Sequence, residues 1–178
     1  MKIISIYPSS ISVISKKFNE ENFYENKYLP VGNTKGKDNN VFRVLMIFDI
    51  KDRLPDACKI KTARLNLCVE KNIYTPCILD SNEVYLNYNT EEYNPLGVTW
   101  DNAPKFIYNK EKASMQGTKT KYFITLNIMD LVNEWIYDYK DNCGITLTGI
   151  EDKANFISIF SYCNNKNKPF IYLEVDDT

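Results

Sequence analysis

The stretch KIKTARLNLCVE, Lys59–Glu70, decides the fold class, because apolar and polar residues alternate along it. One face of an extended chain would carry only apolar residues: Ala63, Leu65, Leu67 and Val69. The opposite face would carry Thr62, Arg64, Asn66 and Cys68. A period of two is typical of a β-strand that turns one face toward a core and the other toward water. We therefore expect this segment to form a strand of an antiparallel sheet.

Further strands are expected on both sides of this segment. VFRVLMIFDI, 41–50, is apolar on both faces apart from Arg43 and Asp49, which is typical of a central strand. Shorter β-type runs occupy 83–88, 121–126, 144–150, 156–162 and 170–175. Loop-forming residues separate them, as in NNKNKP, 164–169. Together these runs predict roughly seven to nine strands in one domain that covers residues 1–178.

One segment breaks the alternation. In LNIMDLVNEWIYDY, 126–139, apolar residues recur at helical spacing and share one face: Ile128, Leu131, Val132, Trp135 and Ile136. We expect a short amphipathic helix over about 128–139, with Asn127 as its N-cap, Trp135 in the core and Gly144 ending or turning the chain. A single helix among many strands predicts an all-β fold, a jelly-roll-like antiparallel β-sandwich whose helix closes one end.

Composition excludes several classes of partner. The chain has 178 residues, 44% hydrophobic residues and a net charge of −1, so it can bury one core but has no basic field to attract nucleic acid. No apolar run reaches the roughly 18 residues that a membrane span needs, so no membrane insertion is expected. The start, MKIISIYPSSISVISKKF, is interrupted by Tyr7-Pro8-Ser9-Ser10, which argues against a signal peptide.

The sequence does not indicate catalysis. It contains no histidine, which removes the commonest general base and the Ser–His and Cys–His nucleophile systems. Adjacent carboxylates such as Glu20 and Glu21 would point to opposite faces of a strand. We therefore expect no enzyme and no catalytic residues.

No metal or cofactor is expected either. The acidic loop 89–94 is the place where calcium could bind, yet it lacks the spacing of a calcium loop. The cysteines are spread without a C-x-x-C pair, so zinc is not predicted. Buried reduced thiols are favoured, with cross-links between subunits as the alternative. The five cysteines are Cys58, Cys68, Cys77, Cys143 and Cys163.

Short motifs along the chain resemble one known family. In order, they are YLPVG (28–32), FRVLMIFDI (42–50), LPDACKIKTARLNL (54–67), VTWDNAP (98–104), ITLNIMDLVNEWI with NCGITL (124–147) and FSYCNNKNKPFIYLEV (160–175). They resemble the DNRLRE domains, which overlap a family of carbohydrate-binding modules and the disaggregatase-related proteins. The resemblance covers about 20–175, although the literal string that names the family is absent. It implies a β-sandwich that binds carbohydrate without catalysis.

Four residues are expected to have structural roles: Trp100, Trp135, Arg43 and Asp49. Arg43 and Asp49 are six residues apart on the same side of their predicted strand, so with Arg64 they could form a charge network inside the sandwich. The alternative is that these charged residues form the polar floor of a ligand-binding site. Trp100 stands before the turn residues Asp101–Pro104, and we favour a core position under the loop over an exposed ligand platform.

Candidate ligand-binding residues gather in EVYLNYNTEEYNP, 83–95. Tyr85 and Asn87 share one strand face there, whereas Leu86 and Tyr88 share the other. Flat aromatic rings beside amide groups suit the recognition of sugars. Tyr93 and Tyr108 are expected to join from the following loops. The predicted ligand-binding set is therefore Tyr85, Asn87, Tyr88, Tyr93, Tyr108 and Arg64.

Two functions remain open at this point. The favoured one is a non-catalytic surface module that binds a polysaccharide or a cell-surface glycan. The alternative is a self-assembling structural subunit of a bacterial cell, spore or appendage surface, in which copies of the chain are the partners and the strand-like residues 1–19 take part in assembly. Either function places the protein at such a surface, although no signal peptide is expected.

Overall fold

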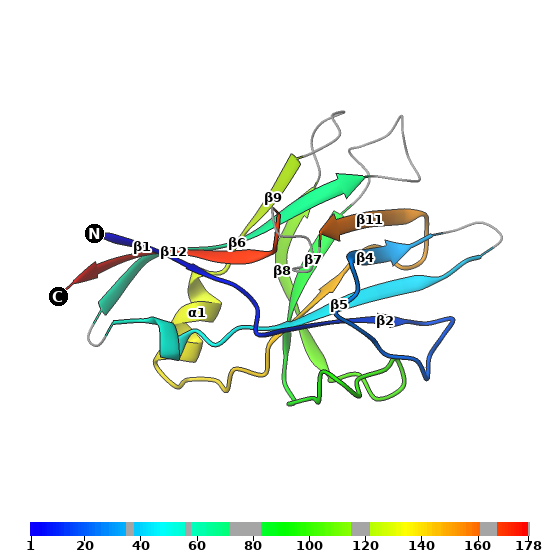
Figure 1. Ribbon diagram of the computed structural model, residues 1–178, viewed down its shortest axis with the longest axis horizontal. Helices are drawn as coiled ribbons and strands as arrows, with labels where there is room; N and C mark the ends of the chain where they lie inside the picture. Colours follow the sequence, from blue (N-terminus) through cyan, green and yellow to red (C-terminus); the bar gives the residue numbers. More distant parts are fainter. Residues whose placement is uncertain (35–37, 56–57, 72–82, 115–121, 161–166, 178) are drawn as a thin grey trace.

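The computed structural model describes residues 1–34, 38–55, 58–71, 83–114, 122–160 and 167–177 (Figure 1). The described part forms one twelve-stranded sheet, in which every strand pair is antiparallel, and one short α-helix. The elements are β1 (Lys2–Ile6), β2 (Ser10–Ser15), β3 (Phe23–Tyr24), β4 (Tyr28–Asn33), β5 (Val41–Ile47), the 3₁₀ turn η1 (Lys51–Arg53), β6 (Cys58–Lys71), β7 (Glu83–Asn89), β8 (Phe106–Ser114), β9 (Tyr122–Asn127), α1 (Met129–Ile136), β10 (Ile145–Thr148), β11 (Asn155–Phe160) and β12 (Phe170–Asp177). The expected all-β fold with one short helix is confirmed.

Strands β5 and β6 are the branch points of the sheet. β6 pairs with β12 and β11 along one edge and with β9 along the other. β5 pairs with β2 along one edge and with β4 and β10 along the other. Strands β11 and β4 connect these two regions, so the sheet folds over itself into a sandwich (Figure 1). β7 and β8 extend the β5 side, and they carry the candidate site.

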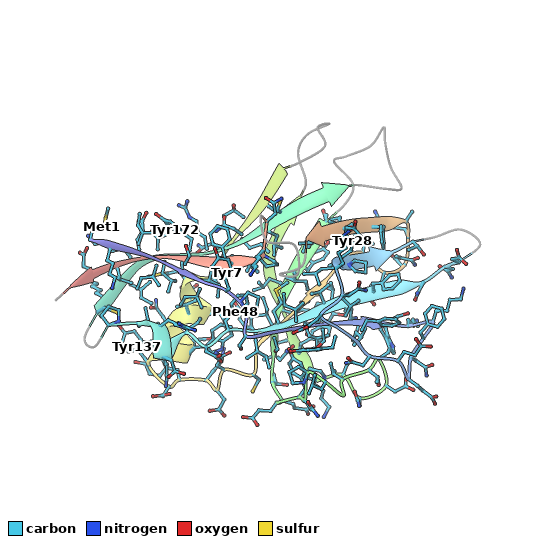
Figure 2. The ribbon with its side chains drawn as sticks, viewed as in Figure 1. Met1, Tyr7, Tyr28, Phe48, Tyr137 and Tyr172 are labelled. Carbon is cyan, nitrogen blue, oxygen red and sulfur yellow. The ribbon has the colours of Figure 1, made fainter. Side chains whose placement is uncertain are left out.

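The core lies between the two layers and contains residues from nearly every strand. The alternation predicted for β6 is confirmed, because Ala63, Leu65, Leu67 and Val69 are all fully buried. Phe48, just beyond β5, is also fully buried and lies in the middle of the molecule (Figure 2). On β5, Val44 and Met46 face this core, whereas Leu45 belongs to a second, smaller cluster on the opposite face. β5 is therefore apolar on both faces because both are covered.

Helix α1 is shorter than the predicted 128–139, at Met129–Ile136. Its apolar face, Leu131, Val132 and Trp135, is buried in the main core, where α1 lies beneath β6 and β12 (Figure 1). Asn127 lies one residue before the N-cap position, and its side-chain oxygen accepts a hydrogen bond from the backbone N–H of Met129 at 3.1 Å. It therefore supports the helix start without being the N-cap.

Gly144 does not end the helix, which stops eight residues earlier at Ile136. Instead it leads into β10 with a φ of +80°, at a point where a Cβ atom would lie 2.5 Å from the backbone oxygen of Met46. The glycine is required because β10 pairs directly with β5 here. Gly144 therefore turns the chain, as predicted, and the element that requires a glycine at this position is the neighbouring strand β5.

Replacing Gly144 with alanine is expected to destabilise the fold by about 1–3 kcal/mol, because alanine is strained at positive φ and its Cβ meets fixed backbone. Urea unfolding followed by circular dichroism measures this. Gly97→Ala is the matched control, since a Cβ there makes only ordinary contacts with the Asn94 side chain. Equal unfolding midpoints for the two variants would contradict the close approach of β10 to β5.

The N-terminal residues are part of the sheet. β1 pairs with β12, and β2 pairs with β5 and β3. Both chain ends lie together at one end of the sandwich (Figure 1). Within the described residues, no helix combines the length and apolar character that crossing a bilayer requires. No disulfide joins Cys58, Cys68 and Cys143, and Cys77 and Cys163 lie outside the described residues.

Candidate functional site

The strands β7 and β8 bring two of the predicted tyrosines to one place. Val84 and Leu86 are fully buried in the main core, so Tyr85 projects to the opposite, outer face of β7, as its alternation predicted. Tyr108 was expected in a loop, but it lies on β8, and its register partner is Asn87 of β7. Tyr108 is 70% exposed. The two tyrosines therefore share the outer face of adjacent strands.

A surface pocket of about 350 Å³, hereafter the tyrosine pocket, lies beside these two side chains. Its volume lies at the lower end of the range typical of small-molecule sites. Residues from β7, β8, the end of β10 and the loop after β10 line it: Tyr85, Tyr108, Thr148, Gly149, Glu151 and Asp152. Aromatic rings, a hydroxyl and two carboxylates thus meet in one small depression.

Arg43 of β5 holds one wall of the tyrosine pocket. Its Nε and Nη2 donate hydrogen bonds to the two carboxylate oxygens of Glu151 at 2.7 and 2.9 Å. The guanidinium carbon also lies 4.2 Å from the ring centre of Trp100 and 5.3 Å from that of Phe106. Such a bidentate, ring-bounded pair fixes both side chains in orientation. Glu151 is therefore a rigid part of the wall.

Phe106 connects this wall to the exposed tyrosine. Its ring lies edge-on to that of Tyr108, with 5.2 Å between the ring centres. Offset and edge-on aromatic pairs of this kind add stability beyond the area they bury. Trp100, Arg43, Phe106 and Tyr108 consequently form a continuous row of contacts along the outer face.

The loop 90–105 covers the neighbouring part of this face. Tyr93, Val98 and Trp100 from the loop pack on Ile14 of β2 and Leu45 of β5. Side-chain hydrogen bonds pin the loop down: Ser12 to the Pro95 oxygen at 2.8 Å, Asn22 to the Pro95 oxygen at 3.1 Å and Asn19 to Asp101 at 2.6 Å. Trp100 is thus partly buried in this cluster, with Arg43 over its ring, and the core role that we expected for it stays a prediction.

The other predicted ligand residues lie elsewhere. Asn87 is fully buried and donates to the Thr146 backbone oxygen and to the Thr148 hydroxyl at 3.1 and 2.9 Å, so it supports the pocket floor from below. Tyr88 packs against the main core on the opposite face of β7, and Lys140 lies over its ring. Tyr93 packs under the loop 90–105. None of these three lines the tyrosine pocket.

The predicted charge network of Arg43, Asp49 and Arg64 does not form. Arg43 pairs with Glu151, which is 108 positions away in the sequence. Asp49 follows the end of β5, so strand alternation no longer sets its side, and it is exposed at a second pocket of about 330 Å³ near η1 and the loop after α1. Arg64 is exposed on β6, where its register partners are Tyr172 and Asn127.

Sequence reasoning missed Glu151, Asp152, Thr148 and Phe106. The two acids follow a strand in an ordinary acidic turn, and no spacing relates them to Tyr85 or Arg43. Among the described residues, no group of three or more cysteine, aspartate or glutamate side chains could hold a metal ion.

The pKa values of two tyrosines on this face of the sheet are raised. The hydroxyl of Tyr85 donates a hydrogen bond to the Glu83 carboxylate, which together with burial raises the pKa of Tyr85 to about 12. Burial raises the pKa of Tyr93, whose hydroxyl has no hydrogen-bond partner among the described residues. Both tyrosines therefore keep their protons at a pH where an unfolded chain would lose them.

Stability is expected to fall as the pH rises from about 10 toward about 12. Over that range the unfolded chain binds fewer protons than the folded one, so the free energy of unfolding decreases. Urea unfolding at a series of pH values measures the slope. Tyr93→Phe removes one of the shifted groups and should make the slope shallower. A slope that is unchanged in this variant would contradict the burial of the Tyr93 hydroxyl.

The chain matches the model of a known family. The model of carbohydrate-binding module family 96 matches residues 5–175, which is nearly the whole chain. It confirms the resemblance drawn from the sequence, because family 96 is the DNRLRE-related family. A search of curated proteins finds no match.

Proposed function

Because this chain belongs to carbohydrate-binding module family 96, we propose that it binds a polysaccharide or a surface glycan, and that the tyrosine pocket is the site. The single observation that supports this site best is that Tyr85 and Tyr108, from adjacent strands, border the same pocket as the carboxylates of Glu151 and Asp152. The family supports the carbohydrate class of the ligand, and this geometry supports the choice of site.

The residues of the pocket suit a sugar ring. The apolar C–H face of a pyranose can lie against the exposed ring of Tyr108, which removes apolar surface from water. Sugar hydroxyls are hydrogen-bond donors, and carboxylates accept only. Glu151 keeps free lone pairs although each of its oxygens already accepts one bond from Arg43, and Asp152 is exposed. Orientation of the ring would come from these acceptors.

Binding without catalysis is the form of this function that we propose. Modules of carbohydrate-binding families are typically non-catalytic. Glu151 is committed to Arg43 through both oxygens, which disfavours a role in proton transfer. Incubation of the chain with each polymer it binds, followed by a reducing-end assay, should show no release of new sugar ends above buffer.

Affinity electrophoresis against a panel of soluble neutral polysaccharides tests the proposal. Mixed-linkage β-glucan, galactomannan and xylan are cast separately into native gels, and insoluble polymers are tested by pull-down. Retardation that depends on polymer concentration supports binding. Migration unchanged by every polymer, together with no pull-down and no signal on a glycan array, would contradict it. Serum albumin run in the same gels controls for retardation by viscosity alone.

The self-assembly alternative is favoured by one observation. Apolar side chains are exposed along the edge strand β1: Met1 before it, Ile3 within it and Tyr7 after it are 80%, 57% and 54% exposed, and Met1 lies at the tip of this edge (Figure 2). Exposed strand edges can pair with other copies. Size-exclusion chromatography with and without reductant separates the two functions: a concentration-dependent oligomer supports assembly, and a monomer at all concentrations contradicts it.

A further inference from the structure

We propose that the outer face of β6, β9 and β12 is a second glycan-binding surface, so that one molecule of this protein can hold two polysaccharide chains. Arg64 stands at its centre. This arginine is a predicted ligand residue that the tyrosine pocket leaves out, and it is exposed on β6 between Tyr172 of β12 and Asn127 of β9. The second surface rests on the proposed function and adds a site to it.

Strand pairing brings six side chains together on this surface, hereafter the Arg64 face. The residues between them in the sequence, such as Leu65 and Leu173, are fully buried in the main core, so the alternate residues project outward. Two rows cross the three strands: Tyr172, Arg64 and Asn127 form one, and Phe170, Asn66 and Thr125 form the other. Since paired strands lie about 4.8 Å apart, each row is about 10 Å long. The face therefore extends beyond a single sugar ring.

The Arg64 face offers hydrogen-bond donors that the described part of the fold does not use. The Arg64 guanidinium has no hydrogen-bond or ion-pair partner among the described residues, and a guanidinium carries five N–H donors. Asn127 accepts from the backbone N–H of Met129 through its Oδ1 at 3.1 Å, which leaves its Nδ2 donors without a described partner. Sugar hydroxyl oxygens accept hydrogen bonds, so these two side chains can hold a sugar at the centre of the face.

Aromatic rings border these donors along β12. Tyr172 and Phe170 stand on the same side of that strand, and the ring of Tyr7, after β1, lies 6.1 Å from that of Phe170 between centres. Tyr7 is 54% exposed, and both Tyr7 and Tyr172 are labelled in Figure 2. The Tyr172 hydroxyl donates to the Glu174 carboxylate at 2.8 Å, which fixes its ring in orientation. Aromatic rings beside unused amide and guanidinium donors are the combination that suits sugar recognition.

The Arg64 face and the tyrosine pocket lie on different sides of the core. Leu65 of β6 and Leu86 of β7 belong to the same buried cluster, and Arg64 and Tyr85 each project away from it. A polysaccharide segment bound at one site therefore leaves the other open to a second chain, so the protein can join two chains. The open face leaves one side of a bound sugar in water, and we expect it to bind more weakly than the pocket.

A bridging assay on beads tests for the second site. Mixed-linkage β-glucan, galactomannan, xylan and polygalacturonate are each coupled to beads, which are incubated with the protein, washed and then offered the same polymer in soluble, fluorescent form. The protein retained on the beads measures glycan binding, and the fluorescent polymer captured afterwards measures the second site. We expect capture above that of beads without protein for each polymer that retains the protein.

Two arginine variants locate that site. Arg64→Ala should capture at least about ten-fold less fluorescent polymer, the usual cost of removing an arginine anchor, while the protein retained on the beads stays the same because the tyrosine pocket is intact. Arg53→Ala is the matched control, since Arg53 is exposed on η1 and its loss removes the same charge. It should bridge like the wild type. The melting temperature of each variant separates loss of bridging from loss of fold.

Wild-type protein that is retained on the beads but captures no fluorescent polymer would overturn the second site and leave the proposed function intact. Capture that persists undiminished in Arg64→Ala would also overturn it, and would show that bridging arises elsewhere, as it would if two copies of the chain joined and each used its tyrosine pocket. Failure of the protein to bind any of the four kinds of bead would instead remove the proposed function, and the second site with it.

Discussion

Replacing Trp135 with alanine is expected to destabilise the protein by about 3–5 kcal/mol, the cost of emptying a large aromatic position in a core. Trp135 is 4% exposed and belongs to the same buried cluster as Leu131 and Val132 of α1. An eight-residue helix is too short to be stable alone, so α1 depends on this contact for its existence. The decrease in the free energy of unfolding should therefore include the cost of the cavity and the cost of disordering α1.

Unfolding of Trp135→Ala by urea, followed by far-UV circular dichroism, measures the change in the free energy of unfolding. Tyr139→Ala is the control, since this tyrosine lies three residues after α1 and is 78% exposed. The control should differ from the wild type by about 0.5 kcal/mol or less. A Trp135→Ala variant within about 1 kcal/mol of the wild type would show that the helix is not part of the cooperative core.

The contrast between β6 and β8 shows what alternation can predict. In β6 apolar and polar residues alternate because the face with Ala63, Leu65, Leu67 and Val69 is buried, whereas Arg64 on the other face is exposed; Cys68 on that other face is nevertheless buried. β8 reads FIYNKEKAS, with charges where a buried face would need apolar residues, so its sequence suggested a loop at Tyr108. It is nevertheless a strand, because β7 supplies its hydrogen-bond partners. Edge position, which no local pattern reveals, explains the difference.

Only part of the candidate site could be predicted from the sequence, because local patterns do not show which distant elements come together. Tyr85 could be placed on the outer face of β7 from its own neighbours in sequence. Glu151 could not be connected to Arg43, because the two residues are 108 positions apart and meet only after β5, β10 and the following loop are in place. Arg43 was expected to be structural, and its partner is Glu151 rather than Asp49 or Arg64. Such contacts depend on pairing between strands that are far apart in the sequence, so the spacing of residues within a short segment does not predict them.

Arg43 links the framework of the sandwich to the tyrosine pocket. It stands on a central strand, with Trp100 of the pinned loop near its guanidinium and Glu151 of the pocket wall at its donor groups. Replacement of Trp100 would therefore disturb the pocket as well as the loop. Tyr85 and Tyr108 are the better residues for testing ligand contact, because neither belongs to a buried cluster of the core.

The double substitution Tyr85→Ala with Tyr108→Ala is expected to weaken polysaccharide binding at least about a hundred-fold. Aromatic residues that anchor a ligand cost about 2 kcal/mol or more each when they are truncated, and two such losses exceed a hundred-fold even when they are not fully additive. Isothermal titration with the polymer that is retarded most strongly in native gels measures the change. The melting temperature is recorded for the same samples, so that loss of binding is separated from loss of fold.

The matched control removes two other exposed tyrosines, Tyr137 and Tyr139, which are 55% and 78% exposed and follow α1; Tyr137 is labelled in Figure 2. Their ring centres lie 6.2 Å apart, so the control also removes two neighbouring tyrosine rings from the surface. It should bind like the wild type. If the control lost binding and the double variant at Tyr85 and Tyr108 kept it, the site would lie at the helix end of the sandwich.

Tyr85→Phe refines the outcome, because it keeps the ring and removes only the hydroxyl that donates to Glu83. Binding retained in Tyr85→Phe but lost in Tyr85→Ala would show that the ring face, rather than the hydroxyl, contacts the sugar.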